Sequence, residues 1–270
     1  MLEVIHISDT HFGPDRSLDI RGANACAHAE ALVKAVNELA FQPDFIVHTG
    51  DVANDPHDKA YALAEEILSE LKAPVYYATG NHDDVSMMRS ALSFGDRVDL
   101  VPDSDNQMCY RIGGAAEEKV QFYVLDGWVP PTEGPHGFLS ENQIEAVLSD
   151  ISGEKPVAVF LHYPLVPIGS PWIDEKLLTK NGIEFQTRLL DAAGSQLRGV
   201  FTGHLHRGLK LFHDGVFHSG VSSPACEFTA GPEDEFCDFL QGGPIPFDHI
   251  TFTEESTMVK SYSLPFEGGE

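Results

Sequence analysis

The chain has 270 residues and a net charge of -25, with 42 Asp and Glu residues against 17 Lys and Arg residues. This charge argues against nucleic acid or an anionic membrane as a partner, because both attract positive protein surfaces. Apolar residues make up 42% of the chain, no apolar run reaches the roughly 18 residues of a membrane span, and no signal-like segment opens the sequence, so we predict a globular cytoplasmic protein.

The first predicted element is a buried strand that ends in polar residues. Apolar and β-branched residues run from Leu2 to Ile7, and Asp9, His11 and Gly13 follow. Later strand-like runs end in the same way, at Gly50-Asp51, Gly80-Asn81-His82-Asp83, His162 and Gly203-His204-Leu205-His206. Because strands of an α/β sheet place ligand sites at their carboxyl ends, we expect these polar groups to meet in one site.

Helices are predicted between these strands, from apolar residues at helical spacing. Their expected ranges are 24–39, 55–71, 87–94, 140–151 and 184–193. Asn24 is a predicted N-cap, Pro56 a predicted first-turn proline, and Ser140 begins a Ser-x-x-Gln capping box. The segment 164–181, with its three prolines, is predicted to be a long functional loop.

Beyond Gly208 the pattern has a period near two, as strands do. Strands are predicted at 209–212, 216–218, 249–253 and 258–264. With the alternating strands and helices of the first half, this predicts an α/β fold of two mixed sheets packed face to face, with helices outside. We predict one domain over residues 1–270 with 226–270 as a cap or dimerisation segment, in which 229–247 is a surface loop, a lid or an oligomer contact.

The polar strand ends supply oxygen and imidazole donors without a thiolate, a set that suits manganese, iron or zinc. These donors are Asp9, His11, Asp51, Asn81, His162, His204 and His206. They are too many for one ion, and one bridging carboxylate gives two adjacent metal positions. Strand alternation is expected to place both outer residues of each Asp-x-His or His-x-His pair on one face. The glycines at 50, 80 and 203 are expected to allow a sharp turn before each ligand.

Two metal ions about 3.5–4 Å apart activate a bridging water as hydroxide and polarise a phosphoryl oxygen, which is the chemistry of phosphate ester hydrolysis. Each motif alone has a structural alternative. Gly50-Asp51 is an ordinary turn, and Asp9-x-His11 is also typical of a strand end exposed to water. Their joint occurrence in this order favours the metal site.

Taken in order, these motifs resemble those of the calcineurin-like metallophosphoesterase superfamily, over roughly residues 2–225. Within it, the chain is similar to the branch of class III cyclic nucleotide phosphodiesterases and glycerophosphodiesterases. That similarity depends on His162-Tyr163-Pro164, on 167–174, and on 134–140, which is similar to the branch's His-Gly-x-Leu-Ser segment. The resemblance implies a four-layer αββα sandwich.

The resemblance also implies roles for the strand-end residues. The first metal would be held by Asp9, His11 and His206 and the second by Asn81, His162 and His204, with Asp51 bridging them. His82, which forms the expected catalytic pair with Asn81, would stabilise charge at the scissile phosphate or protonate the leaving alkoxide. The alternative for His82 is to orient Asn81 or Asp83. Asp83 is expected to hold an imidazole, and Tyr163, where many relatives have a second histidine, is expected to alter the shape of the pocket.

We therefore expect a dinuclear-metal phosphodiesterase that hydrolyses a small phosphodiester, with a 3′,5′-cyclic nucleotide as the first candidate and two divalent ions (Mn²⁺, Fe²⁺/Fe³⁺ or Zn²⁺) as cofactors. Glycerophosphodiesters and phosphomonoesters are alternative substrates for the same metal core. A noncatalytic interaction module is the alternative of another class, although such a module would be expected to have lost ligands. A nuclease is not expected, because the chain is acidic. The expected partners are the small substrate and a second copy of the chain.

Overall fold

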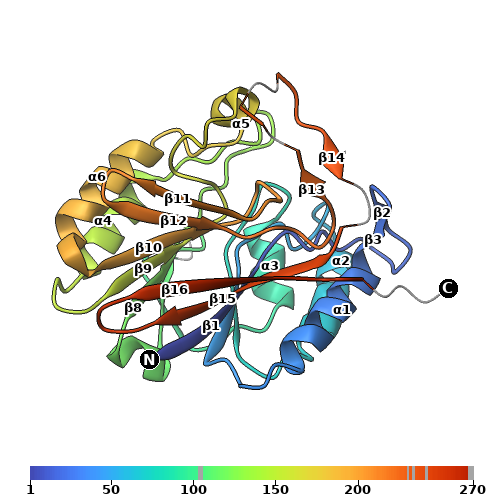
Figure 1. Cartoon of the computed structure of the whole chain (residues 1–270), viewed down its shortest axis with the longest axis horizontal. Helices are drawn as coiled ribbons and strands as arrows, with labels where there is room; N and C mark the ends of the chain where they lie inside the picture. The colour runs from blue at the N-terminus through green and yellow to red at the C-terminus, as the bar shows by residue number, and fades with distance from the viewer. Residues whose placement is uncertain (103–105, 230, 233–234, 241–242, 267–270) are drawn as a thin grey trace.

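The computed structural model describes residues 1–102, 106–229, 231–232, 235–240 and 243–266. Its strands form two large mixed sheets with helices on their outer sides (Figure 1). Side chains from both sheets belong to one buried hydrophobic cluster. A second cluster lies between the outer face of the seven-stranded sheet and the helices that cover that face. The predicted arrangement of two packed sheets flanked by helices is confirmed.

The first sheet has the strand order β16-β15-β1-β4-β5. Its strands are β1 (Leu2–Ile7), β4 (Phe45–His48), β5 (Val75–Tyr77), β15 (Ile245–Phe252) and β16 (Thr257–Leu264). β1 pairs in parallel with β4 and β4 with β5, so their carboxyl ends lie at one edge. β15 pairs antiparallel with β1 and β16 with β15, so much of the segment 226–270 belongs to this sheet.

The second sheet has the strand order β11-β12-β10-β9-β8-β7-β6. Its strands are β6 (Arg97–Asp99), β7 (Tyr110–Ile112), β8 (Gln121–Val124), β9 (Val157–Phe160), β10 (Leu197–Thr202), β11 (Leu209–His213) and β12 (Val216–Gly220). β8 pairs in parallel with β9, β9 with β10, and β10 with β12, so the carboxyl ends of these strands also lie at one edge.

Helices cover the outer faces (Figure 1). Those beside the first sheet are α1 (Ala25–Asn37), α2 (Asp58–Leu68) and α3 (Val85–Ala91), and those beside the second are α4 (Glu141–Asp150) and α6 (Gly182–Ala193). The connections contain α5 (Pro171–Lys176) and the short 3-10 helices η2 (Gly114–Glu118) and η3 (Gly194–Gln196). Two small hairpins pair β2 (Asp19–Ile20) with β3 (Ala23–Asn24), and β13 (Glu227–Phe228) with β14 (Phe239–Leu240). Within the described residues, no helix is both long enough and apolar enough to cross a membrane.

Aromatic side chains fill the space between the two sheets. The Phe122 ring in the second sheet has its centroid 5.0 Å from those of Phe45 and Phe252 in the first. Phe160 and Phe201 stack with their centroids 5.0 Å apart, and all of these rings are buried. Burial of such rings is a large part of the hydrophobic free energy of folding, and their contacts join the two sheets.

The predicted helix over 24–39 is confirmed as α1, where the Asn24 side chain accepts a hydrogen bond from the N–H of Ala27 at 2.9 Å. The predicted start of the next helix at 55–56 is wrong. α2 begins at Asp58, and its N-cap is His57, whose Nδ1 accepts from the backbone N–H of Lys59 at 3.0 Å. The preceding residues instead form a loop next to the strand-end polar groups.

The predicted cap at Ser140 is confirmed, because its side chain accepts from the backbone N–H of Gln143. The Gln143 side chain, however, exchanges hydrogen bonds with the backbone of Asp126 and not with the start of the helix. The segment 164–181 is not loop throughout, since it contains α5. Six residues are too few for a periodic pattern to be recognised in a sequence.

Candidate metal centre

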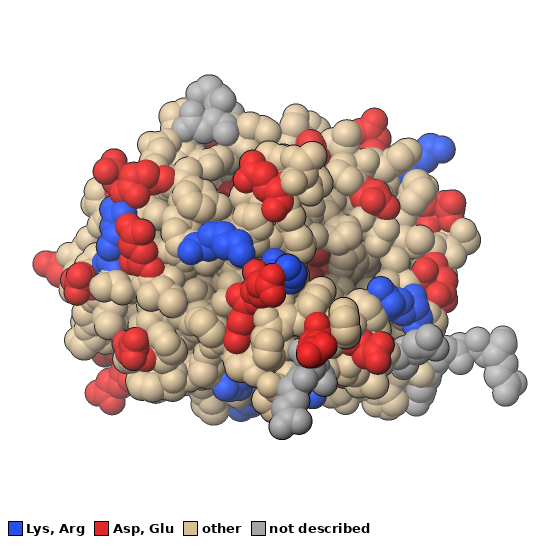
Figure 2. Space-filling view, turned by 90° about the horizontal axis from the view of Figure 1, so that it is seen from above, with Lys and Arg blue, Asp and Glu red and all other residues tan. Residues whose placement is uncertain are grey.

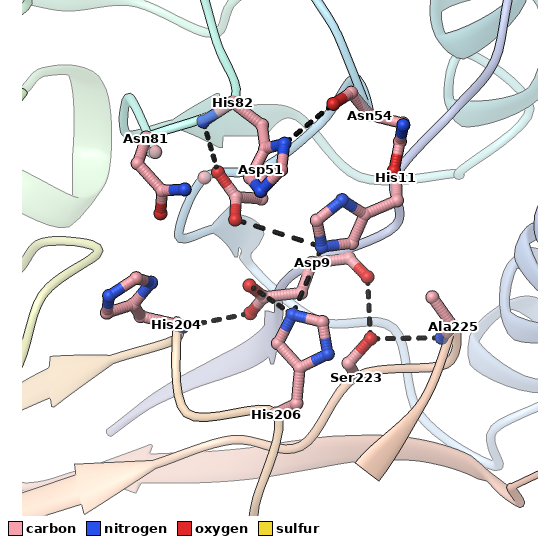
Figure 3. Close-up of polar contacts among 12 residues, drawn as sticks. Asp9, His11, Asp51, Asn54, Asn81, His82, His204, His206, Ser223 and Ala225 are labelled. Carbon is pink, nitrogen blue, oxygen red and sulfur yellow. Dashed lines mark hydrogen bonds and ion pairs between the residues drawn. The ribbon is translucent and has the colours of Figure 1, made fainter. Parts of the chain in front are cut away.

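The predicted donors converge where the carboxyl edges of the two sheets adjoin (Figure 3). Two buried groups, each with donor atoms within 4.8 Å of one another, are formed by Asp9, His11, Asp51 and His206 and by Asp51, His162 and His204. Asn81 adjoins the second group, with its Oδ1 3.3 Å from His162 Nε2. Asp51 belongs to both groups, so its carboxylate is positioned to bridge two metal ions.

The backbone of five of these residues is left-handed, a conformation that residues other than glycine rarely adopt. Their φ angles are 56° at Asp9, 49° at His11, 53° at Asp51, 67° at His204 and 46° at His206. The prediction that strand alternation makes each pair converge is wrong, because β1 ends at Ile7 and β10 at Thr202, before the ligands. Left-handed turns direct these side chains instead, at a cost of about 1–3 kcal/mol for each residue.

The glycines before the ligands act in two ways. Gly50 has a φ of 95°, so the sharp turn expected there is confirmed. Gly80 and Gly203 do not have positive φ angles but provide space. A Cβ atom on Gly80 would lie 2.1 Å from Asp51 Oδ1, which leaves no room for any other residue.

Gly203→Ala is expected to lower the free energy of unfolding by about 1–3 kcal/mol, because of overpacking. The added Cβ would lie 1.9 Å from Ser8 Oγ and 2.7 Å from Asp9 Oδ2. Urea unfolding of the metal-free protein measures the change. Gly208→Ala is the matched control, since nothing lies within 4 Å of its Cβ position. Equal destabilisation by the two substitutions would contradict the expected steric conflict.

A hydrogen bond from one ring nitrogen of His162 to a backbone carbonyl orients the ring so that the second ring nitrogen faces a carboxylate. Its Nδ1 donates a hydrogen bond to Thr49 O at 2.7 Å, which also connects the second sheet to the first. In the neutral ring this leaves the lone pair on Nε2. That atom lies 3.3 Å from Asp51 Oδ2 and 3.3 Å from Asn81 Oδ1. Electron-rich atoms that face each other in this way form an environment for a cation.

His206 is arranged similarly. Its Nδ1 lies 3.0 Å from Cys226 O and donates to that carbonyl, so the lone pair of the neutral ring is on Nε2. This atom lies 3.2 Å from Asp9 Oδ1 and 3.0 Å from His11 Nε2. The backbone O of Asp9 in turn accepts a hydrogen bond from Ser223 Oγ at 2.7 Å (Figure 3). The first donor group is therefore held by contacts outside the ligands, as metal ligands commonly are.

The same carboxylates alter the pKa values of these two histidines. Burial lowers the pKa of His162, but the Asp51 carboxylate and other neighbours outweigh it and raise the pKa to about 9. Burial likewise opposes protonation of His206, and Asp9 outweighs it and raises the pKa to about 10. In the absence of a metal ion, protons on these rings therefore balance the buried carboxylates. Metal binding would release those protons, as it does at other sites with histidine ligands.

Several polar atoms of the centre have no hydrogen-bond partner among the described residues. They include buried His204 Nε2, and Asp9 Oδ1 has only the ion-pair contact with His206 Nε2 at 3.2 Å. Burial lowers the pKa values of His11 and His204 to about 3, so both rings are neutral. Buried polar atoms without partners are rare, and two divalent ions would satisfy these ones. The residues present therefore fit a dinuclear metal centre.

Asp83 lies beside the centre but does not hold an imidazole, so that prediction is wrong. Its carboxylate accepts hydrogen bonds at 3.0, 3.2 and 3.1 Å from the backbone N–H groups of Gly80, Val52 and Ala53. It thereby fixes the loop that carries Asp51 against the loop that carries Asn81. Burial and the nearby Asp51 charge raise the pKa of Asp83 to about 6.

His82 is half-buried at the rim of the centre (Figure 3). Its backbone N–H donates to Asp51 Oδ1 at 2.9 Å, and its Nδ1 lies 2.6 Å from Asn54 O. Within the described chain, its ring makes no hydrogen bond to Asn81 or Asp83, the partners of its alternative role. With Nδ1 directed at a carbonyl, Nε2 is left for another contact. Nothing in the sequence pattern indicated the contribution of Asn54.

A cavity of about 280 Å³ opens beside the centre, lined by His82, Asn81 and several of the other donors. Its other walls come from segments far apart in the chain, and they include Ile20, Arg21, Trp172, Leu177, Phe228 and Phe239. None of these six was identified as a site residue from the sequence, although Trp172 and Leu177 lie in the marked segment 164–181 and Phe239 in 229–247. Figure 2 shows the molecule from above Figure 1, with Asp and Glu scattered over a surface that is hollowed near its middle.

Comparison with known proteins shows a family and several relatives. The family model described as calcineurin-like phosphoesterase matches residues 2–208. The 3′,5′-cyclic adenosine monophosphate phosphodiesterase CpdA of Haemophilus influenzae is 27% identical, over 90% of this chain and 84% of its own. The glycerophosphodiester phosphodiesterase GpdQ of Enterobacter lignolyticus is 29% identical, over 74% of this chain and 69% of its own. Among solved structures, a dimetal phosphatase from Danio rerio has a TM-score of 0.68 at 15% identity, covering 97% of this chain and 99% of that one, and thus shares the fold.

Proposed function

The chain belongs to the calcineurin-like phosphoesterase family, and on that premise we propose that it is a dinuclear-metal phosphodiesterase whose substrate is a 3′,5′-cyclic nucleotide. The observation that carries the proposal is the position of Asp51 in both buried donor groups. The name of the relative from Haemophilus influenzae supports a cyclic nucleotide. The relative named as a glycerophosphodiester phosphodiesterase makes such diesters the second candidate.

The proposed ligands follow the two donor groups. The first ion would be held by Asp9, His11 and His206 and the second by Asn81, His162 and His204, with Asp51 bridging. Divalent ions held there would supply Lewis acidity, which polarises phosphoryl oxygens and acidifies water. The donor set suits Mn²⁺, Fe²⁺/Fe³⁺ and Zn²⁺ alike, so the choice among them stays a prediction.

His82 is proposed to move a proton in the reaction. When both ring nitrogens carry protons, Nδ1–H stays on Asn54 O while Nε2–H is available to the leaving alkoxide. Asn81 lines the same cavity and is proposed to contact the phosphate. The apolar side chains of the cavity, Trp172 and Leu177 among them, would keep water from the leaving group.

The organisation of the protein belongs to the same proposal. Residues 1–270 would form a single metallophosphoesterase domain, in which the hairpin β13–β14 lies over the cavity as a cap. The homodimer and the cytoplasmic location stay predictions from the sequence. Exposed Phe236 and Leu240, next to and in this hairpin, support a contact surface there.

The test is a comparison of substrates with Mn²⁺-loaded protein. We expect turnover of bis(p-nitrophenyl) phosphate and of 3′,5′-cyclic AMP, with far less turnover of p-nitrophenyl phosphate, and loss of activity after chelation. A kcat/KM that is higher for glycerophosphocholine than for the cyclic nucleotide would favour the second candidate. Activity on the monoester alone would reject the phosphodiesterase proposal.

A further inference from the structure

Two hairpins from distant parts of the chain meet beside the metal centre. Arg21 lies in the turn between β2 and β3, and Phe239 begins β14. The Arg21 guanidinium carbon lies 3.1 Å from the centroid of the Phe239 ring. Figure 1 shows the two hairpins next to each other. Both residues line the cavity that also contains Asn81 and His82.

Arg21 has a backbone conformation that disfavours a long side chain. Its φ is 52° and that of Gly22 is 88°, which is typical of the two-residue hairpin turns that prefer Asn, Asp or Gly. A long side chain with positive φ is uncommon and is a reason to look for a function. The turn thus holds an arginine at the cavity despite the backbone cost.

No carboxylate in the described part of the chain pairs with the Arg21 guanidinium. Among the described residues its side chain makes no hydrogen bond or ion pair, in a chain with 42 acidic residues. By contrast, the nearby Arg16 pairs with Glu30 and Glu66. In the described lining of the cavity, Arg21 is the one Lys or Arg side chain. Its N–H donors are therefore available to a ligand.

An aromatic wall leads from the metal ligands to this guanidinium. The Phe228 ring stacks on His206, with centroids 4.4 Å apart and an interplanar angle of 19°. The Phe239 ring is perpendicular to Phe228, with centroids 4.9 Å apart. Trp172, Leu177 and Ile20 add to the apolar lining. Such walls favour a planar ring over a glycerol chain or a second phosphate group.

We propose that this cavity is a nucleobase subsite in which Arg21 selects guanine over adenine, an inference that rests on the proposed function. The guanidinium lies over the Phe239 ring, and its planar fork presents two N–H groups along one edge. Guanine offers two acceptors there, N7 and O6, whereas adenine offers an acceptor and an amino donor. A neutral base also adds no negative charge to an acidic protein, unlike a second phosphate. The substrate it indicates is 3′,5′-cyclic GMP.

The experiment compares kcat/KM for 3′,5′-cyclic GMP and 3′,5′-cyclic AMP in Mn²⁺-loaded wild type, Arg21→Ala and Arg21→Lys. We expect the wild type to prefer the guanine nucleotide and Arg21→Ala to lower the guanine-to-adenine ratio by about 10- to 100-fold, the effect of one bidentate pair. Arg21→Lys should lose most of the preference, because lysine keeps the charge without the planar fork. Calorimetric titration with 5′-GMP and 5′-AMP gives the same comparison for binding alone.

Arg16→Ala is the matched control, since it removes one exposed positive charge outside the cavity. Its guanine-to-adenine ratio should equal that of the wild type. A wild-type preference for adenine, or an unchanged ratio in Arg21→Ala, would overturn the inference while leaving the phosphodiesterase proposal in place. Equal loss on both nucleotides and on bis(p-nitrophenyl) phosphate would also overturn it, in favour of a structural role. Absence of turnover of any diester by the wild type would instead reject the proposed function.

Discussion

Asp51→Asn is expected to lower kcat for diester hydrolysis by at least about 10³-fold. The Asp51 carboxylate belongs to both donor groups, and His162 Nε2 lies 3.3 Å from its Oδ2. Lewis acidity at such a site contributes several kcal/mol to transition-state stabilisation, and each 1.36 kcal/mol is a factor of about ten in rate. Steady-state hydrolysis of bis(p-nitrophenyl) phosphate, together with the metal content of each preparation, measures the effect.

Asp191→Asn is the matched control, because it makes the same chemical change at an exposed carboxylate on α6 that is not in either donor group. Its activity should stay close to that of the wild type. Circular dichroism of both variants checks that the fold is retained. An Asp51→Asn protein that kept two metal ions and more than a tenth of the wild-type activity would show that the bridging role is wrong.

His82→Ala is expected to lower kcat by about 10²–10⁴-fold on substrates with a poor leaving group. The reason is that its Nε2 is available to the leaving alkoxide while Asn54 O holds Nδ1. A p-nitrophenolate leaves without protonation, so the loss should be much smaller for bis(p-nitrophenyl) phosphate than for an alkyl phosphodiester such as a cyclic nucleotide. The measurement is kcat for both substrates in wild type and variant.

His136→Ala is the control for this experiment, as it removes a half-buried imidazole that is not in the described lining of the cavity. It should change neither the rate nor the ratio of the two substrates. If His82→Ala lost activity equally on both substrates, His82 would act on the phosphate or on ligand positions and not on the leaving group.

The donors themselves were predictable from the sequence, because apolar runs that end in Asp, Asn or His mark the carboxyl ends of strands. Asp9, Asp51 and His162 follow β1, β4 and β9, and parallel pairing brings these ends to one edge of each sheet. The αββα layers were predictable for the same reason, since alternating strands and helices must cover both outer faces. The assignment of each donor to one of two ions depends on the resemblance and stays a proposal.

The detailed geometry of the site depends on contacts that no local sequence pattern encodes. The left-handed φ angles of Asp9 and His206 arise beyond the strands, where periodicity gives no information. The role of Asp83 follows from backbone N–H groups that lie 30 or more residues before it, at Val52 and Ala53. Arg21 and Phe239 are separated by most of the chain, and only the packing of two short hairpins brings them into contact.

At the five ligands with left-handed backbone, the stability of the fold and the activity of the enzyme make conflicting demands on the same residues. Each of the five residues costs the fold backbone energy that glycine would not. A laboratory selection for heat resistance alone places no value on the ligands themselves, so it does not protect residues such as Asp9 or His206 from replacement. When this enzyme is evolved for industrial temperatures, the screen therefore needs to reward hydrolysis in every round.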